Sequence, residues 1–205
     1  MRALLLDFGN VVGYFDHRRA CRQLAELSRT AMTEDEVYRT VFESPLEPDV
    51  DRGLVSTAAF VALLREHLHL DAADDAIARA WCDIFEPNVD LIAQLPALKA
   101  RAGRLVLASN TNELHFSWIR RQFADALGWF DACVVSYEAG VLKPDRAFFE
   151  HCARVAGQAP AACVFVDDKP AFVDAARHLG MAGVVYTPGL DLLAAVERAT
   201  PGGRP

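Results

Sequence analysis

The sequence lacks any apolar stretch approaching the roughly 20 residues that a membrane-spanning helix needs. Its first apolar run, Ala3–Leu6, ends at Asp7 and is too short for the core of a secretion signal. Basic residues are few: 21 Lys and Arg face 28 Asp and Glu, for a net charge of −7. Because sequence-independent binding to nucleic acids depends on clustered positive charge, we expect neither a nucleic-acid nor a membrane partner.

Cysteine pairs are also missing. The five cysteines are odd in number, scattered, and nowhere spaced as CxxC, which argues against a disulfide framework or a zinc site. Cys133 and Cys163 lie inside apolar runs and are expected to pack as small core residues. No internal repeat is present. We therefore expect a soluble, cytoplasmic protein.

The apolar residues that are present predict a parallel sheet. At 205 residues and 52% hydrophobic content, the chain can form one core, or one core with a small appendage. Five short apolar runs do not alternate with polar residues, as is typical of strands buried on both faces. Helical patterns separate the later runs, which indicates a doubly wound α/β layer. The runs are Ala3–Leu6, Leu105–Ala108, Ala132–Ser136, Cys163–Val166 and Gly183–Tyr186.

Helix signals without a convincing strand fill the interval from Phe15 to Glu86. Thr33 and Glu36 form a capping box, and Ser56 and Asp71 are placed to cap further helices. The sequence therefore predicts a helical cap, residues 16–86, inserted into a core formed by residues 1–15 and 87–205. The Gly- and Pro-rich tail, 200–205, is expected to fray.

Polar residues follow the ends of the expected strands. Ligands of open parallel sheets bind at the carboxyl ends of strands, so these residues are expected to converge. Each alone has an ordinary explanation as a turn residue, a helix cap or a solvated charge, but four such coincidences are less probable than one site. The residues are Asp7, Ser109-Asn110, Lys143, which precedes Pro144 at an expected helix start, and Asp167-Asp168.

The chemistry of this set favours phosphoryl transfer. Three neighbouring carboxylates repel one another unless a cation joins them, and an all-oxygen site suits Mg²⁺. Asp7 could then attack phosphorus and form an aspartyl-phosphate. Ser109 and the backbone amide of Asn110 would hold the phosphoryl oxygens, and Lys143 would neutralise their charge. The expected partner is a small phosphorylated metabolite.

Taken in order, these four motifs resemble those of the haloacid dehalogenase-like (HAD) hydrolases. The resemblance covers nearly the whole chain, and in detail it is similar to sugar-phosphate phosphatases of the α-glucose-1-phosphate phosphatase type and to the phosphatase domain of soluble epoxide hydrolases. It implies a Rossmann-like core with a helical cap, and Mg²⁺ as cofactor. It also implies that Asp7 is the nucleophile, that Asp7, the Gly9 carbonyl, Asp168 and Asp167 are metal ligands, and that Ser109, Asn110 and Lys143 bind phosphate. The stretches are DFGNVV (7–12), LASNTNELHF (107–116), GVLKPDRAFF (140–149) and VFVDDKPAFVDAARHLGM (164–181).

Two positions depart from the family pattern. Gly9 stands where most related phosphatases have an acid, and Phe172 stands where many have an Asn that supports the metal site. Without that acid, the enzyme is expected to favour phosphates with acidic leaving groups, such as anomeric, aryl or acyl phosphates, over primary-alcohol phosphates. Tyr14, Asp16 or His17 could replace the acid, although each is more typical of a hinge or helix cap.

Two other functions remain open. A hydrolytic dehalogenase uses the same Asp on carbon, needs no proton donor for the leaving halide and needs no Mg²⁺. The second is a non-catalytic protein that binds a phosphorylated ligand, in which Gly9 and Phe172 would mark the loss of catalytic residues. The Asp167-Asp168 pair favours the metal-dependent phosphatase.

Overall fold

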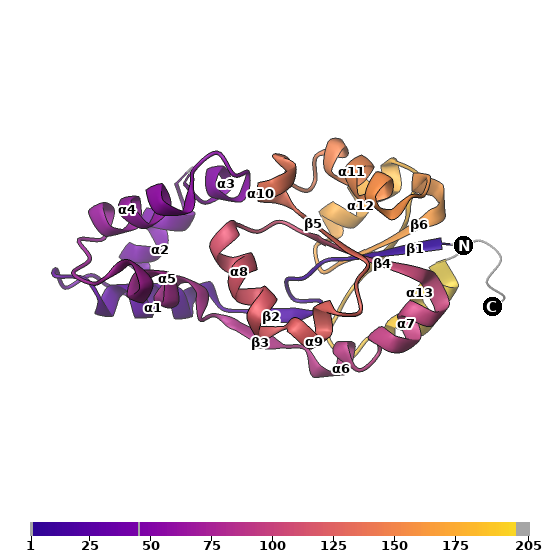
Figure 1. Ribbon diagram of the computed structural model, residues 1–205, viewed down its shortest axis with the longest axis horizontal. Coiled ribbons are helices and arrows are strands. Elements are labelled where there is room, and N and C mark those ends of the chain that lie inside the picture. Colours follow the sequence, from indigo (N-terminus) through magenta and orange to yellow (C-terminus); the bar gives the residue numbers. More distant parts are fainter. Residues whose placement is uncertain (1, 45, 200–205) are drawn as a thin grey trace.

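A five-stranded parallel sheet forms the centre of the protein (Figure 1). The computed structural model describes residues 2–44 and 46–199. The strand order is β5-β4-β1-β6-β7, so the chain moves outward from β1 first in one direction and then in the other. This order confirms the expected doubly wound sheet. The strands are β1 (Arg2–Leu6), β4 (Gly103–Ser109), β5 (Ala132–Val135), β6 (Cys163–Asp167) and β7 (Ala182–Val185).

The sheet is buried on both faces, which explains the continuous apolar runs. In β1, Leu4 and Leu6 belong to one buried cluster, whereas Ala3 and Leu5 belong to the other. Successive side chains of a strand point to opposite faces, so an uninterrupted run supplies both cores. All five expected strands are confirmed within one or two residues of their predicted bounds.

Helices cover both faces of the sheet (Figure 1). Residues of α11 and α12 join the cluster that contains Leu5, and residues of α6, α7, α8 and α13 join the cluster that contains Leu4. The helices of this part are α6 (Val89–Ile92), α7 (Leu95–Ala102), α8 (Glu113–Gln122), α9 (Ala124–Leu127), α10 (Ser136–Ala139), α11 (Arg146–Ala156), α12 (Pro170–His178) and α13 (Leu192–Ala199), with a 3-10 turn, Pro160–Ala162.

Between β1 and α6 in sequence, the described residues form five helices, which lie as a group beside the sheet (Figure 1). A two-stranded antiparallel ribbon, β2 (Gly13–Phe15) paired with β3 (Phe85–Pro87), leads into this group and out of it. We had not expected this ribbon, because strands of three residues are too short to show a periodic pattern. The helices are α1 (His17–Glu26), α2 (Glu34–Phe42), α3 (Leu46–Asp51), α4 (Thr57–His67) and α5 (Asp74–Cys82).

Local capping signals in this helical group were mostly correct. The Thr33–Glu36 capping box and the Ser56 cap are both present. The prediction for Asp71 was wrong, because α5 begins at Asp74 after Ala73. Another prediction was wrong in the core: α11 begins at Arg146, so Pro144 lies before the helix and not in its first turn.

The division of the chain into residues 1–15 and 87–205 on one side and 16–86 on the other stays a prediction. The tail, 200–205, lies outside the described residues. Among the described helices, none is long and apolar enough to cross a membrane.

Candidate active site

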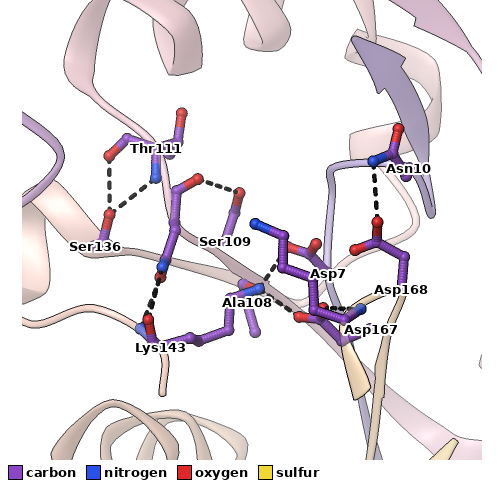
Figure 2. A network of polar contacts seen from close by, with 11 residues as sticks. Asp7, Asn10, Ala108, Ser109, Thr111, Ser136, Lys143, Asp167 and Asp168 are labelled. Atoms are coloured by element: carbon purple, nitrogen blue, oxygen red, sulfur yellow. Dashed lines mark hydrogen bonds and ion pairs between the residues drawn. The ribbon is translucent and has the colours of Figure 1, made fainter. Parts of the chain in front are cut away.

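Three carboxylates meet at the carboxyl edge of the sheet. Asp7 follows β1, Asp167 is the last residue of β6, and Asp168 comes next. One carboxylate oxygen from each lies within 4.8 Å of the others (Figure 2). Asp167 is fully buried, Asp7 is 7% exposed, and Asp168 is half-buried. The neighbouring parallel strands β1 and β6 bring these side chains together, although 160 residues separate them in the sequence.

Lys143 joins this acidic group from the chain that follows β5. Its Nζ donates to Asp7 Oδ1 and to Asp167 Oδ2, each at 2.7 Å, and to the Ala108 carbonyl at 3.0 Å (Figure 2). An ammonium has three protons, so each is directed at an oxygen. The side chain is 1% exposed, and a buried charge of this kind is stable only with such partners.

The charges in this group shift one another's titration. Burial and, to a smaller extent, the neighbouring Asp167 raise the pKa of Asp7 to about 6 against the opposing charge of Lys143. Burial pulls the pKa of Lys143 down, but the Asp7 and Asp167 carboxylates outweigh it and raise the pKa above its usual value. The ammonium therefore stays charged, and Asp7 and Asp167 share this one cation.

Asn110 holds the Lys143 segment in place. Its Oδ1 accepts from the Lys143 backbone N–H at 2.8 Å, and its Nδ2 donates to the Lys143 carbonyl at 3.0 Å. This pair of bonds joins the end of β4 to the residue before the cis Lys143–Pro144 bond. The side chain of Asn110 thus positions Lys143, a role that the sequence did not reveal, and only its backbone amide is left for the phosphate role that we expected.

The segment from Ser109 to Asn112 leads into the N-terminus of α8. Ser109 is buried, and the N–H of Thr111 donates to Ser136 Oγ at 2.9 Å, which returns a bond to the Thr111 carbonyl. Asn112 caps the helix by accepting from the His115 N–H. The segment is therefore held rigidly at a helix N-terminus, where the dipole favours an anion.

Asn10 is a site residue that sequence analysis missed. Its Nδ2 donates to Asp168 Oδ2 at 3.0 Å (Figure 2), and its φ of 54° is in the left-handed region, where Asn is better tolerated than most residues. The available signal was an Asn after Gly in a tight turn. Asn10 orients Asp168 from the loop that follows Asp7, which is a support that Phe172 cannot provide.

The two departures from the family pattern have structural counterparts. The side of Gly9 where a side chain would project is occupied by the ring of Phe15. The ring of Phe172 lies 5.4 Å from Lys143 Nζ and 5.1 Å from Lys169 Nζ, within range of cation–π attraction to both. Both positions are therefore filled by packed aromatic rings.

A cavity of about 240 Å³ opens over these residues and extends to the helical group. From the sheet edge it is lined by the acids, Lys143, Ser109 and Asn110, and from above by apolar and polar side chains of the inserted helices. The lining residues contributed by the helical group and its ribbon are Phe15, His17, Glu47, Pro48, Asp51 and Phe85. Of the three alternative acids that we considered, only His17 lines the cavity; Asp16 caps α1 and pairs with Arg22.

The donor set fits a hard divalent cation. Three carboxylates offer oxygen ligands within 4.8 Å of one another. Asn10 donates a hydrogen bond to one of them, Asp168, and carboxylates that bind metals typically accept such a supporting hydrogen bond. Asp167 has both oxygens engaged, by Lys143 and by the Lys169 N–H, so Asp7 and Asp168 are the acids better placed for direct ligation. Gly9 lines the same cavity.

A doubly wound sheet with a carboxylate after β1, a lysine beyond β5 and paired acids after β6 defines a class of hydrolases with an α/β fold and the site at the carboxyl edge of the sheet. The family model for the haloacid dehalogenase-like hydrolases matches residues 53–180, more than half of the chain. The protein belongs to this family, and it is a hydrolase with the Rossmann-like core that the sequence predicted.

Individual relatives agree with this assignment. The sesquiterpene phosphatase astK of Aspergillus oryzae is 25% identical over 160 residues, which cover 74% of this chain and 77% of the relative. The drimenol cyclase drtB of Aspergillus calidoustus is 29% identical over 204 residues; these cover 91% of this chain but 34% of the relative, so this chain spans about a third of that protein's length.

A solved structure has the same fold. The HAD family enzyme bt-2542 of Bacteroides thetaiotaomicron, in complex with magnesium and inorganic phosphate, superimposes with a TM-score of 0.77 at 24% identity. The match covers 93% of this chain and 96% of that chain. At this identity the likeness shows the fold.

Proposed function

We propose that this protein is a Mg²⁺-dependent phosphatase that hydrolyses a small phosphorylated metabolite, a sugar phosphate being the first candidate, through an aspartyl-phosphate. The observation that carries the proposal is the convergence of Asp7, Asp167 and Asp168 within 4.8 Å, with Lys143 bonded to two of them. A dehalogenase, whose Asp attacks carbon without a metal ion, needs no such cluster of acids.

The relatives support the phosphate class. One is a phosphatase by name, and the similar solved structure holds magnesium and inorganic phosphate. The cavity also supports a small substrate, because its volume of about 240 Å³ adjoins the acids and is closed on the far side by the helical group. We infer that this group acts as the cap over the site and selects the substrate.

In this proposal, Asp7 attacks phosphorus with a carboxylate oxygen, and the bond from phosphorus to the leaving-group oxygen breaks. Ser109 and the N–H of Asn110 hold the phosphoryl oxygens at the start of α8. Lys143 keeps Asp7 in position through the 2.7 Å bond and offers positive charge to the phosphoryl group. Water then attacks the phosphorus of the aspartyl-phosphate, which releases inorganic phosphate and restores the Asp7 carboxylate.

Asp7, Asp168 and the Gly9 carbonyl are the proposed direct ligands of the metal, and Asp167 is proposed to act through water. When bound, the ion supplies positive charge that shields the Asp7 carboxylate from the negatively charged phosphate. Lys143 is the one cation bonded to Asp7 and Asp167 among the described residues, so three clustered carboxylates leave room for the charge of a metal ion.

The test is release of inorganic phosphate from p-nitrophenyl phosphate and from sugar 1-phosphates and 6-phosphates, with Mg²⁺ and with a chelator. We expect phosphate release in the presence of Mg²⁺ and none in the presence of the chelator. Asp7→Asn, which keeps the shape of the side chain but removes the proposed nucleophile, should be inactive. Asp90→Asn, at an exposed position on α6, is the matched control and should remain active.

Two results would overturn the proposal. If the protein released halide from a 2-haloacid at the same rate with and without a chelator, and released no phosphate, it would be a dehalogenase. Binding of the phosphate esters without turnover by the folded wild type, unchanged by Mg²⁺, would identify a non-catalytic binding protein.

A further inference from the structure

Two carboxylates of the inserted helices face the reaction centre from above. Glu47 and Asp51 are four residues apart on α3, so they lie on the same face of the helix. Both line the cavity that Asp7, Lys143 and Ser109 line from below. The sequence did not reveal these two residues, because α3 is a short helix that lies between the first and second family motifs in the sequence and belongs to neither.

The position of α3 over the site is held by close contacts with the core. Asn112 Nδ2 donates to Asp51 Oδ1 at 3.1 Å, and Thr57, at the start of α4, donates to Glu113. Gly53, just after α3, has a φ of 71°, and a Cβ there would lie 2.3 Å from the Tyr137 carbonyl oxygen. The backbone after α3 therefore approaches α10 more closely than any residue with a side chain allows.

The two carboxyl groups have different surroundings. Asp51 accepts the hydrogen bond from Asn112, whereas the part of the chain that the structure describes offers no hydrogen bond or ion pair to the carboxyl of Glu47. Burial and, to a smaller extent, the Asp51 carboxylate raise the pKa of Glu47 to about 7 against the opposing charge of Lys169. Burial raises the pKa of Asp51 as well, to about 6, so Glu47 is the acid of this pair that keeps its proton to the higher pH.

The two histidines that line the cavity are poor proton donors near pH 7. Burial lowers the pKa of His17 to about 4, and that of His115 to about 3, so both are neutral near pH 7. His115 also has both ring nitrogens engaged, by Asn112 and by the Trp81 carbonyl.

The charges that act on Glu47 come from two elements. They are Asp51 on its own helix and Lys169 after β6. On the helices packed against α3, the titratable groups are Glu34, Asp35, Glu36, Tyr38 and Arg39 of α2 and Tyr137 and Glu138 of α10.

We propose that Glu47 is the general acid and base of this hydrolase, delivered by the helical cap to replace the acid absent at Gly9. The inference rests on the proposed phosphatase function. As Asp7 attacks and the phosphorus–oxygen bond of the ester breaks, the Glu47 carboxyl gives its proton to the leaving-group oxygen. The Glu47 carboxylate then takes a proton from the water that attacks the aspartyl-phosphate, so each cycle restores the protonated acid and the free Asp7.

This assignment widens the substrate class. Gly9 alone predicts a preference for acidic leaving groups, because an ordinary alkoxide leaves poorly without a proton. With Glu47 present, primary-alcohol phosphates become substrates of the wild type. The preference for acidic leaving groups is then expected of the Glu47→Gln variant.

The experiment compares p-nitrophenyl phosphate, whose leaving group is acidic, with a sugar 6-phosphate, in Mg²⁺. Glu47→Gln should lower kcat/KM for the sugar 6-phosphate by about 10²–10⁴-fold and for p-nitrophenyl phosphate by less than about tenfold. Asp49→Asn is the matched control on the same helix, outside the cavity lining, and should leave both rates unchanged. Glu47→Asp, which keeps a carboxyl, should restore part of the lost rate.

The pH profile supplies a second readout that a structural role would not move. Wild-type kcat/KM for the sugar 6-phosphate should fall as the pH rises above about 7, because Glu47 loses its proton. Glu47→Gln should lack this decline, and Asp51→Asn should shift it to lower pH, because the like charge that holds the proton on Glu47 is gone.

An equal loss on both substrates in Glu47→Gln, or no loss on the sugar 6-phosphate, would overturn the assignment. If that variant did not fold by circular dichroism, a wild-type profile without a decline above pH 7 would overturn it. Failure of the proposed function looks different, since wild type would then hydrolyse neither ester.

Discussion

The ring of Phe15 fills the space beside Gly9: a Cβ placed on Gly9 would lie 2.8 Å from Cε1 of Phe15. That ring is itself packed at 4.8 Å from the ring of His17, between centroids. At the position where the family pattern has an acid, β2 therefore brings the Phe15 ring against the loop that follows Asp7. Gly9 and Phe15 should behave as a coupled pair.

Gly9→Asp should lower the free energy of unfolding by about 1–3 kcal/mol, because the new side chain overlaps the Phe15 ring. Combined with Phe15→Leu, the same substitution should cost less than the sum of the two single changes, with a coupling of about 0.5 kcal/mol or more. Urea denaturation of the two single variants and the double variant measures this. Strict additivity would show that the ring moves away freely.

Asn10 is expected to support the metal site through Asp168. Asn10→Gly keeps the left-handed backbone but removes the 3.0 Å hydrogen bond, so Mg²⁺ affinity should fall about 10–100-fold with little loss of stability. Asn10→Ala should lose the same affinity and also about 1 kcal/mol of stability, because a Cβ is unfavourable at a φ of 54°. Thermal shift against Mg²⁺ concentration measures both effects. Unchanged affinity in both variants would contradict the role.

Gly53 and Gly140 form a natural comparison, since both have a φ of 71° but only Gly53 has a close neighbour. Substitution by Ala at either position should cost about 1 kcal/mol from the backbone alone. Gly53→Ala should cost a further 1–3 kcal/mol or so and raise KM, because the methyl group meets the Tyr137 carbonyl and displaces α3. Chemical denaturation and steady-state kinetics test this, and equal losses of stability with unchanged KM would contradict it.

His115 should make the protein sensitive to acid. Burial lowers its pKa to about 3, more than the hydrogen bond to the Trp81 carbonyl raises it, whereas the unfolded chain has the ordinary value near 6.5. Between these values the unfolded state binds the proton and the folded state does not. The stabilising contribution is therefore complete above about pH 6.5 and is lost as the pH falls toward 3.

The corresponding measurement is the unfolding free energy at pH 7 and pH 4.5. The advantage of wild type over His115→Gln should shrink by roughly 3 kcal/mol at the lower pH, at about 1.4 kcal/mol per pH unit below 6.5. His178→Gln, at an exposed position on α12, should show no such change. A constant difference between wild type and His115→Gln would mean that His115 is protonated in the folded state.

The residues at the ends of the strands could be predicted from the sequence because strands buried on both faces leave a short-range pattern. Runs such as Leu4–Leu6 show burial on both faces, and in a parallel sheet the residue after each run must lie at the same edge. The convergence of Asp7, Lys143 and Asp167 follows from that geometry. The role of the Asn110 side chain and the Asn10–Asp168 bond did not follow, because both depend on loop conformations that no periodicity encodes.

The sequence by itself determined the sheet, the inserted helices and the acids and lysine at one edge, since apolar periodicity and turn residues act over a few positions. Only the tertiary structure decided what covers that edge. Glu47 and Asp51 line the same cavity as Asp7, and Phe15 lies beside Gly9, because the ribbon and the close contact of Gly53 with Tyr137 return the helices to the core. Those contacts join distant residues through shape and packing, which no local pattern of residues specifies.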